Sequence, residues 1–174
     1  MMTDFIGTGV VMMTRSLLIR LLAAAGLLAP QGAAAQLGDR ACASSGSAVL
    51  VTVTGLKPSG GRLRVQAYGA DPDKFLKKGE WIRRADVALG SRTSATVCLA
   101  LPQAGRYAIA VRHDANASGK SDWNDGGGFS RNPKLSLLNY KPRFENAVVT
   151  VPEGVLRLKI VMNYRRGLSI GPLR

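Results

Sequence analysis

The chain has 174 residues, with 24 lysines and arginines against 11 aspartates and glutamates, which gives a formal net charge of +13 at pH 7. This length is enough for one ordinary domain with its own hydrophobic core. The charge favours contact with anionic surfaces, although a solvated basic surface without a partner is the alternative. The basic residues are dispersed, and no aromatic-interleaved nucleic-acid motif occurs among them.

The first segment, residues 1–35, has the features of an export signal. Two arginines precede or interrupt an apolar run, and AAAQ provides a small-x-small cleavage site after Ala35. Because the apolar run is short for a membrane span, we expect cleavage rather than a membrane anchor. Translation starts at Met1 or at Met13, where the positive charge would stand nearer the front. The mature protein is expected in the periplasm or outside the cell.

Cys42 and Cys98 are the only cysteines, and both follow the predicted signal. An even count in an oxidising compartment favours a disulfide between them over two free thiols. The bridge would tie a short flexible lead, residues 36–47, to the middle of the domain. A long closed loop of this kind stabilises a fold by about 2–4 kcal/mol when it is unstrained.

Short strand patterns separated by turn clusters run through the predicted domain, residues 48–164. The expected strands are 48–56, 62–68, 94–101, 106–114, 145–154 and 155–164, with a weaker edge strand or loop over 82–93. About seven strands with almost no helix pattern predict an all-β antiparallel β-sandwich, immunoglobulin-like or transthyretin-like. A small closed barrel is the alternative.

Three other segments interrupt or follow these strands. Asp71 or Asp73 is placed to cap a short helical turn that carries Phe75 and Leu76. Residues 115–144 are rich in Asn, Asp, Gly, Ser and Pro and predict a long irregular loop, and a loop of that length is usually functional. Residues 165–174 are expected to be a C-terminal tail with little structure of its own.

The start of the long loop matches the ligand spacing of an EF-hand calcium loop. The candidate calcium ligands are Asp114, Asn116, Ser118, the carbonyl of Lys120, Asp122 and Asp125. Gly119 falls at the sixth position, where a sharp turn leaves no room for a side chain. Ser118 is a neutral donor and Asp125 is shorter than glutamate, so the predicted affinity is weak, with a Kd of about 10⁻⁴–10⁻³ M. A metal-free polar turn is the alternative, since the same residue types favour turns.

Catalytic signals are weak. His113 is the only histidine, and it lies in phase with the apolar face of its strand, which indicates a structural role. The chain has no nucleophile motif such as G-x-S-x-G, and its cysteines lack zinc-ligand spacing. We therefore expect no enzyme. Trp123 and Phe129 are candidates for a binding surface that stacks on a sugar or a partner, or for a lid over one end of the sandwich.

Four pieces of sequence occur in a recognisable order: VLVTVTGLKPSGGRLRVQAYG, LPQAGRYAIAVRHDANASGKSD, GGGFSRN and PRFENAVVTV. Over residues 48–164 the chain resembles the bacterial exported family called domain of unknown function 2141. The resemblance implies an export signal, a β-sandwich and a periplasmic or secreted location, and it brings no established activity. The chain departs from the family at Ala117-Ser118, where Gly-Asn is common, and at Ser121, where Leu is common, which weakens the expected metal site.

These observations predict an exported, non-enzymatic β-sandwich domain with a structural or binding role and a candidate calcium loop. The alternative is a basic adhesion-type module that binds anionic glycan or lipid head groups at the cell envelope. The oligomeric state is not predicted.

Overall fold

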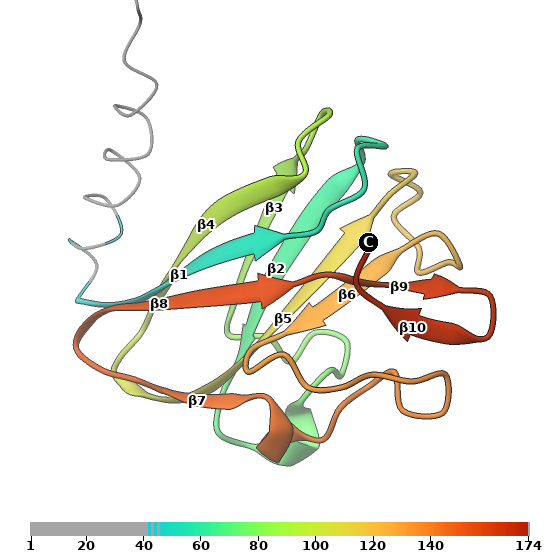
Figure 1. The fold of residues 1–174 in the computed structure, drawn as a ribbon. Coiled ribbons are helices and arrows are strands. Elements are labelled where there is room, and N and C mark those ends of the chain that lie inside the picture. Colours follow the sequence, from blue (N-terminus) through green and yellow to red (C-terminus); the bar gives the residue numbers. More distant parts are fainter. Residues whose placement is uncertain (1–41, 43, 45, 174) are drawn as a thin grey trace, which may run out of the picture. The chain divides into compact units, whose positions relative to one another are not determined.

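A computed structural model describes residues 42, 44 and 46–173, so the predicted export signal lies outside the described residues. The described residues form two sheets, one with the strand order β4-β1-β8 and one with the order β10-β9-β6-β5-β2-β3, in which β7 also pairs with β5. Figure 1 shows the smaller sheet in front of the larger one. The all-β sandwich is confirmed. The elements are β1 (Ser47–Thr54), β2 (Arg62–Tyr68), η1 (Pro72–Lys74), β3 (Arg83–Ala88), β4 (Ser94–Leu101), β5 (Gly105–Asp114), β6 (Gly126–Phe129), η2 (Phe144–Asn146), β7 (Val148–Val151), β8 (Gly154–Val161), β9 (Asn163–Arg166) and β10 (Ser169–Gly171).

The hydrophobic core lies between the two sheets and follows the alternation seen in the sequence. Each strand turns every second side chain inward, because successive side chains of a strand point to opposite faces. Val51 of β1, Val65 of β2 and Ile109 of β5 are all fully buried in this layer. Burying one such side chain stabilises the fold by about 1.5–3 kcal/mol. The outward side chains of the larger sheet are therefore left to form a second surface.

The smaller sheet differs from the predicted antiparallel arrangement in one pair. β1 pairs with β4 in antiparallel fashion, with Ser47 opposite Leu101, but with β8 in parallel, with Ser47 opposite Gly154. The reason is the path of the chain, which passes from β7 in the larger sheet into β8 and so runs in the same direction as β1. In Figure 1 the arrows of β1 and β8 point the same way.

The predicted irregular stretch 115–144 contains a strand of the larger sheet. β6 reads Gly-Gly-Gly-Phe and pairs with both β5 and β9. Gly126 and Gly128 face the core, where an added Cβ would lie 2.4 Å from the ring of Tyr164 and 2.7 Å from Ile160. Large side chains of neighbouring strands fill that space, so glycine is required here although its strand propensity is low.

The predicted strand 155–164 is two strands in different sheets. The chain leaves the smaller sheet at Met162, whose N–H donates to the carbonyl of Thr54 at 2.9 Å. β9 then joins the larger sheet and forms a hairpin with β10, with Arg165 opposite Ile170. Residues 165–174 were expected to have little structure of their own, but Arg165 and Arg166 pair with Ile170 and Ser169 in this hairpin.

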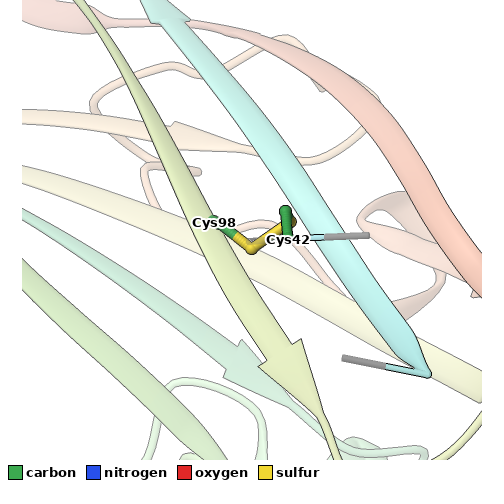
Figure 2. The surroundings of a disulfide bond; sticks show 2 residues. All are labelled: Cys42 and Cys98. Atoms are coloured by element: carbon green, nitrogen blue, oxygen red, sulfur yellow. A yellow bond between two sulfur atoms is a disulfide. The ribbon is translucent and has the colours of Figure 1, made fainter. Parts of the chain in front are cut away.

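Two local predictions have clear outcomes. Asp71 caps η1, since its carboxylate accepts from the N–H of Asp73 at 2.9 Å. The disulfide between Cys42 and Cys98 is confirmed, and its Cα atoms lie 5.7 Å apart. Figure 2 shows the bridge on β4 beside β1. It joins the lead to the outer face of the smaller sheet, where Leu50 also packs.

Replacing both Cys42 and Cys98 by serine is expected to lower the free energy of unfolding by about 2–4 kcal/mol, because the unfolded chain then regains the freedom of the opened loop. Urea denaturation of the oxidised protein and of the double variant measures this difference. Reductant should destabilise only the parent protein. Equal stability of the two proteins would show that the bridge contributes nothing.

Candidate functional site

The β5–β6 loop, residues 115–125, is organised by the carboxylate of Asp114. This side chain is buried, and it accepts from the N–H of Ser118 at 3.0 Å and from the N–H of Gly119 at 2.8 Å. Arg112 also approaches it, at 3.4 Å. Gly119 has a φ of +76°, a conformation that favours glycine. The glycine expected at a sharp turn is therefore required by the backbone.

The other two carboxylates of the loop differ in environment. The backbone N–H of Asn124 and the side chain of Asn116, which donates at 2.7 Å, hold the pKa of Asp122 below its usual value. Burial raises the pKa of Asp125, and the negative charges of Asp122 and Asp114 add to this effect. Asp125 also accepts from the N–H of Ala115 at 3.2 Å. The charges of Asp114 and Asp122 are therefore close enough to Asp125 to disfavour its ionised form.

The remaining predicted calcium ligands belong to the same hydrogen-bond network. Ser118 Oγ donates to the carbonyl of Lys120 at 3.1 Å, and the amide oxygen of Asn116 accepts from the N–H of Ser118. The sequence spacing thus identified residues that do lie together. Within the part of the chain that the structure describes, no group of three or more His, Cys, Asp or Glu side chains is arranged to hold a metal ion. Calcium coordination stays a prediction.

His113 joins three segments in the interior. The carbonyl of Gly60 can only accept, so His113 Nε2 donates to it at 2.8 Å. In the uncharged ring Nδ1 is then the acceptor, and the Tyr164 hydroxyl donates to it at 2.6 Å. The same hydroxyl accepts from the N–H of Lys57 at 3.2 Å. Burial raises the pKa of Tyr164 to about 12, which keeps its hydroxyl protonated as a donor.

Replacing Tyr164 by phenylalanine is expected to lower the free energy of unfolding by about 1–3 kcal/mol, because a buried N–H and a ring nitrogen lose their partner. Tyr140, which is 56% exposed, provides the matched control, and Tyr140→Phe should leave stability unchanged. Chemical denaturation of both variants measures the contrast. Similar stabilities for the two would refute the structural role of the His113 network.

A groove of about 970 Å³ lies on the outer face of the larger sheet. Its floor is formed by outward residues of β2, β5, β6 and β9, and the β5–β6 loop and the segment 135–141 border it. The groove is lined by seven basic residues and by two acidic ones, Asp122 and Asp125. The basic residues are Arg64, Lys78, Arg84, Arg112, Lys120, Lys141 and Arg165.

Glycine at the centre of β6 keeps the floor open. Gly127 points away from the core, and a Cβ added there would meet no atom within 4 Å. Its neighbours across the sheet are Arg112 on β5 and Asn163 on β9. The floor is therefore bare at its centre and polar on both sides.

The predicted binding pair, Trp123 and Phe129, both border the groove but in different ways. Trp123 is 73% exposed, and the guanidinium of Arg165 lies 3.6 Å from its ring centre. Phe129 is buried in a second apolar cluster on the outer face, together with Tyr68 and Phe144. Trp123 is thus an exposed aromatic at the rim, while Phe129 forms part of the floor.

Most of the groove was not recognised in the sequence. The alternation of β2 predicted a polar outer face that includes Arg64, but Trp81, Lys141 and Arg165 come from segments far apart in the chain. No local spacing links these residues, since sheet pairing alone brings them together. Arg165 was not predicted as a groove residue, because residues 165–174 were expected to be a tail with little structure.

The paired sheets and the hollowed basic face define the class of protein as a β-sandwich domain with an outer-face groove. Residues 51–158, more than half of the chain, match the family of uncharacterized proteins conserved in bacteria known as DUF2141, and the chain belongs to this family. The resemblance seen in the sequence is confirmed. No curated protein and no solved structure matches the chain. Among the described residues, no helix is long and apolar enough to cross a membrane.

Proposed function

We propose that the protein is an exported, non-enzymatic binding domain that holds an anionic component of the cell envelope in the outer-face groove. The observation that carries this proposal is the excess of seven basic over two acidic side chains around one groove of about 970 Å³. A concave surface lined by one sign of charge focuses the electrostatic potential and attracts ligands of opposite charge. The Cys42–Cys98 disulfide supports a location in an oxidising compartment, as the export signal predicts.

The arginines of the groove are held in place by the protein. Arg64 and Arg84 both pair with Asp86, at 2.8 Å and 2.6 Å, and these contacts outweigh the effect of burial and lower the pKa of Asp86. Arg112 donates to Ser121 Oγ at 3.0 Å. Fixed guanidinium groups give a preorganised positive floor that needs little rearrangement to accept an anion.

The lysines at the rim are the groups available for a ligand. Within the described part of the chain, Lys78, Lys120 and Lys141 have no acidic side chain within salt-bridge distance. Lys141 lies over the ring of Tyr140 at 5.6 Å, on the exposed border of the groove. An ammonium group on a flexible stem adapts to anions of different shape, which suits a binding role.

Three features support a role without catalysis. The chain's only histidine is fully buried and hydrogen-bonded at both ring nitrogens, so it is not exposed in the groove. Both cysteines are joined in the disulfide, so neither offers a thiolate nucleophile. The acidic residues of the groove, Asp122 and Asp125, belong to one hydrogen-bonded loop and do not face each other across the groove.

The double variant Lys120→Ala/Lys141→Ala is expected to bind an anionic envelope fraction about thirtyfold more weakly, since each lost charge removes about 1 kcal/mol of attraction. Gly127→Leu, which fills the floor without changing charge, should weaken binding as well. Sedimentation of the purified protein with envelope material, at low and high salt, measures retention. The control Lys134→Ala/Lys159→Ala removes two charges outside the groove and should bind like the parent. Retention that is insensitive to the groove variants would refute the proposal.

Calcium binding by the β5–β6 loop is a second candidate function, and it is supported by the hydrogen-bond network that joins Asp114, Asp122 and Asp125 through Ser118 and the loop backbone. A bound cation would offset their repulsion and the entropy cost of ordering the loop. Calcium prefers oxygen ligands of this kind, from side chains and backbone carbonyls. The basic surroundings weaken any such site.

Millimolar calcium is expected to raise the melting temperature by several degrees relative to chelator, and more at neutral than at acidic pH, because a protonated Asp125 cannot bind the ion. Asp125→Asn should abolish the shift, whereas Glu153→Gln, on the β7–β8 turn, should preserve it. Thermal melts of the three proteins test this. Identical melts of the parent with calcium and with chelator would exclude the site.

A further inference from the structure

The groove changes in polarity along the strands of the larger sheet. Towards the β5–β6 loop, the outward residues of β2 and β5 are Arg64 and Arg112, which face each other across the pair. One step further, about 6–7 Å along the strands, the facing pair is Gln66 and Ala110, and Ala110 faces Phe129 on β6. The floor therefore has two arginines at its centre towards the β5–β6 loop, which we call the cationic end, and Ala110 and Phe129 at its centre one step further, which we call the apolar end. Asp122 and Asp125 of the loop also border the cationic end, and Arg84 lies beside Gln66 at the edge of the apolar end.

Aliphatic and aromatic side chains enclose the apolar end. Leu76, Trp81 and Leu135 pack against the outer cluster that contains Tyr68 and Phe129, and all of them line the groove. Most of these side chains carry no hydrogen-bonding group, so they desolvate a ligand without offering polar contacts.

One wall of the apolar end is the strap, residues 133–141, which forms neither helix nor strand. Leu135 and Leu137 of the strap line the groove. Leu138, the next residue, is fully exposed and does not line the groove. Among the described residues, the strap's hydrogen bonds join Ser136 and Asn139 to each other. Alternate leucines of the strap therefore serve the groove, and Leu138 offers a matched control.

The apolar end of the groove distinguishes between an acidic glycan and an anionic lipid, both of which fit the basic charge of the groove. An acidic glycan presents hydroxyl groups along its whole length, and those groups would lose their hydrogen bonds to water at the apolar end. A hydrocarbon chain gains free energy at the same place in proportion to the apolar surface it buries. The volume of about 970 Å³ lies in the usual range for sites that hold small molecules.

Resting on the proposed function of the groove, we infer that its ligand is a single-chain lipid with an anionic head group. The head group lies at the cationic end, near Arg112 and Lys120. The hydrocarbon chain runs over Phe129 and beneath Leu135 and Leu137 of the strap. Charge complementarity selects the head group, and the aliphatic walls select the chain.

Titration of the disulfide-bonded protein with a series of saturated carboxylates tests this inference. The chain has two tryptophans, Trp81 and Trp123, and both line the groove, so their fluorescence reports binding. From butanoate through octanoate and decanoate to dodecanoate, the affinity should rise about fifteenfold for each two methylene groups that are buried. Dodecyl phosphate should bind like dodecanoate, and uncharged dodecanol at least about tenfold more weakly. An affinity independent of chain length would overturn the inference.

Variants of the strap locate the chain. Leu135→Gln/Leu137→Gln is expected to lower the affinity for dodecanoate about tenfold, while Leu138→Gln leaves it unchanged, and circular dichroism checks that all three proteins are folded. Equal affinity in the double variant and its control would overturn the inference.

An acidic sugar oligomer separates this inference from the proposed function. Should oligogalacturonate bind in a manner that depends on Lys120 and Lys141, while dodecanoate does not bind, the groove is an anion site and the lipid inference is overturned. Should neither probe bind, and retention on envelope material not depend on these lysines, the proposed function is overturned as well.

Discussion

The hydrogen bond from the Tyr164 hydroxyl to Nδ1 of His113 fixes how β9, β5 and the β1–β2 loop meet. Tyr164 can occupy this position only because Gly126 has no side chain, since a Cβ there would lie within the Tyr164 ring's contact distance. The requirement for glycine in β6 thus originates in the core. It also explains why a glycine-rich strand forms the middle of the groove, where Gly127 leaves the outer surface bare.

The outer face of the larger sheet uses the same strands for a different purpose. Asp86 on the edge strand β3 pairs with Arg64 and Arg84, so two guanidinium groups are oriented without losing the positive sign of the surface. Such pairs on a partly exposed face contribute little to stability. Their effect is on orientation, because the shared carboxylate holds both guanidinium groups in place. The same strands therefore pack the core with one face and carry the fixed charges of the groove on the other.

Alternation in the sequence predicted the strands over 48–114 and the inward set that includes Val65 and Ile109, because two-residue periodicity is a local signal. It failed at β6, where glycines have no alternation, and at β10, whose pairing depends on β9. The calcium-like spacing found residues that do meet, since a loop is contiguous in the chain. The groove was not predictable in this way, because six strands, the β5–β6 loop, the segment 76–81 and the strap supply its residues.

The parallel pairing of β1 with β8 has a consequence for the order of events during synthesis. β1 lies between β4 and β8, and Ser47 faces Gly154, so the smaller sheet stays incomplete until almost the whole chain is available. Contacts between residues so distant in sequence form slowly, because the intervening chain must first be closed into a loop. Until β8 has been synthesised, β1 therefore has β4 as its only strand partner among the described residues, and its other edge stays open.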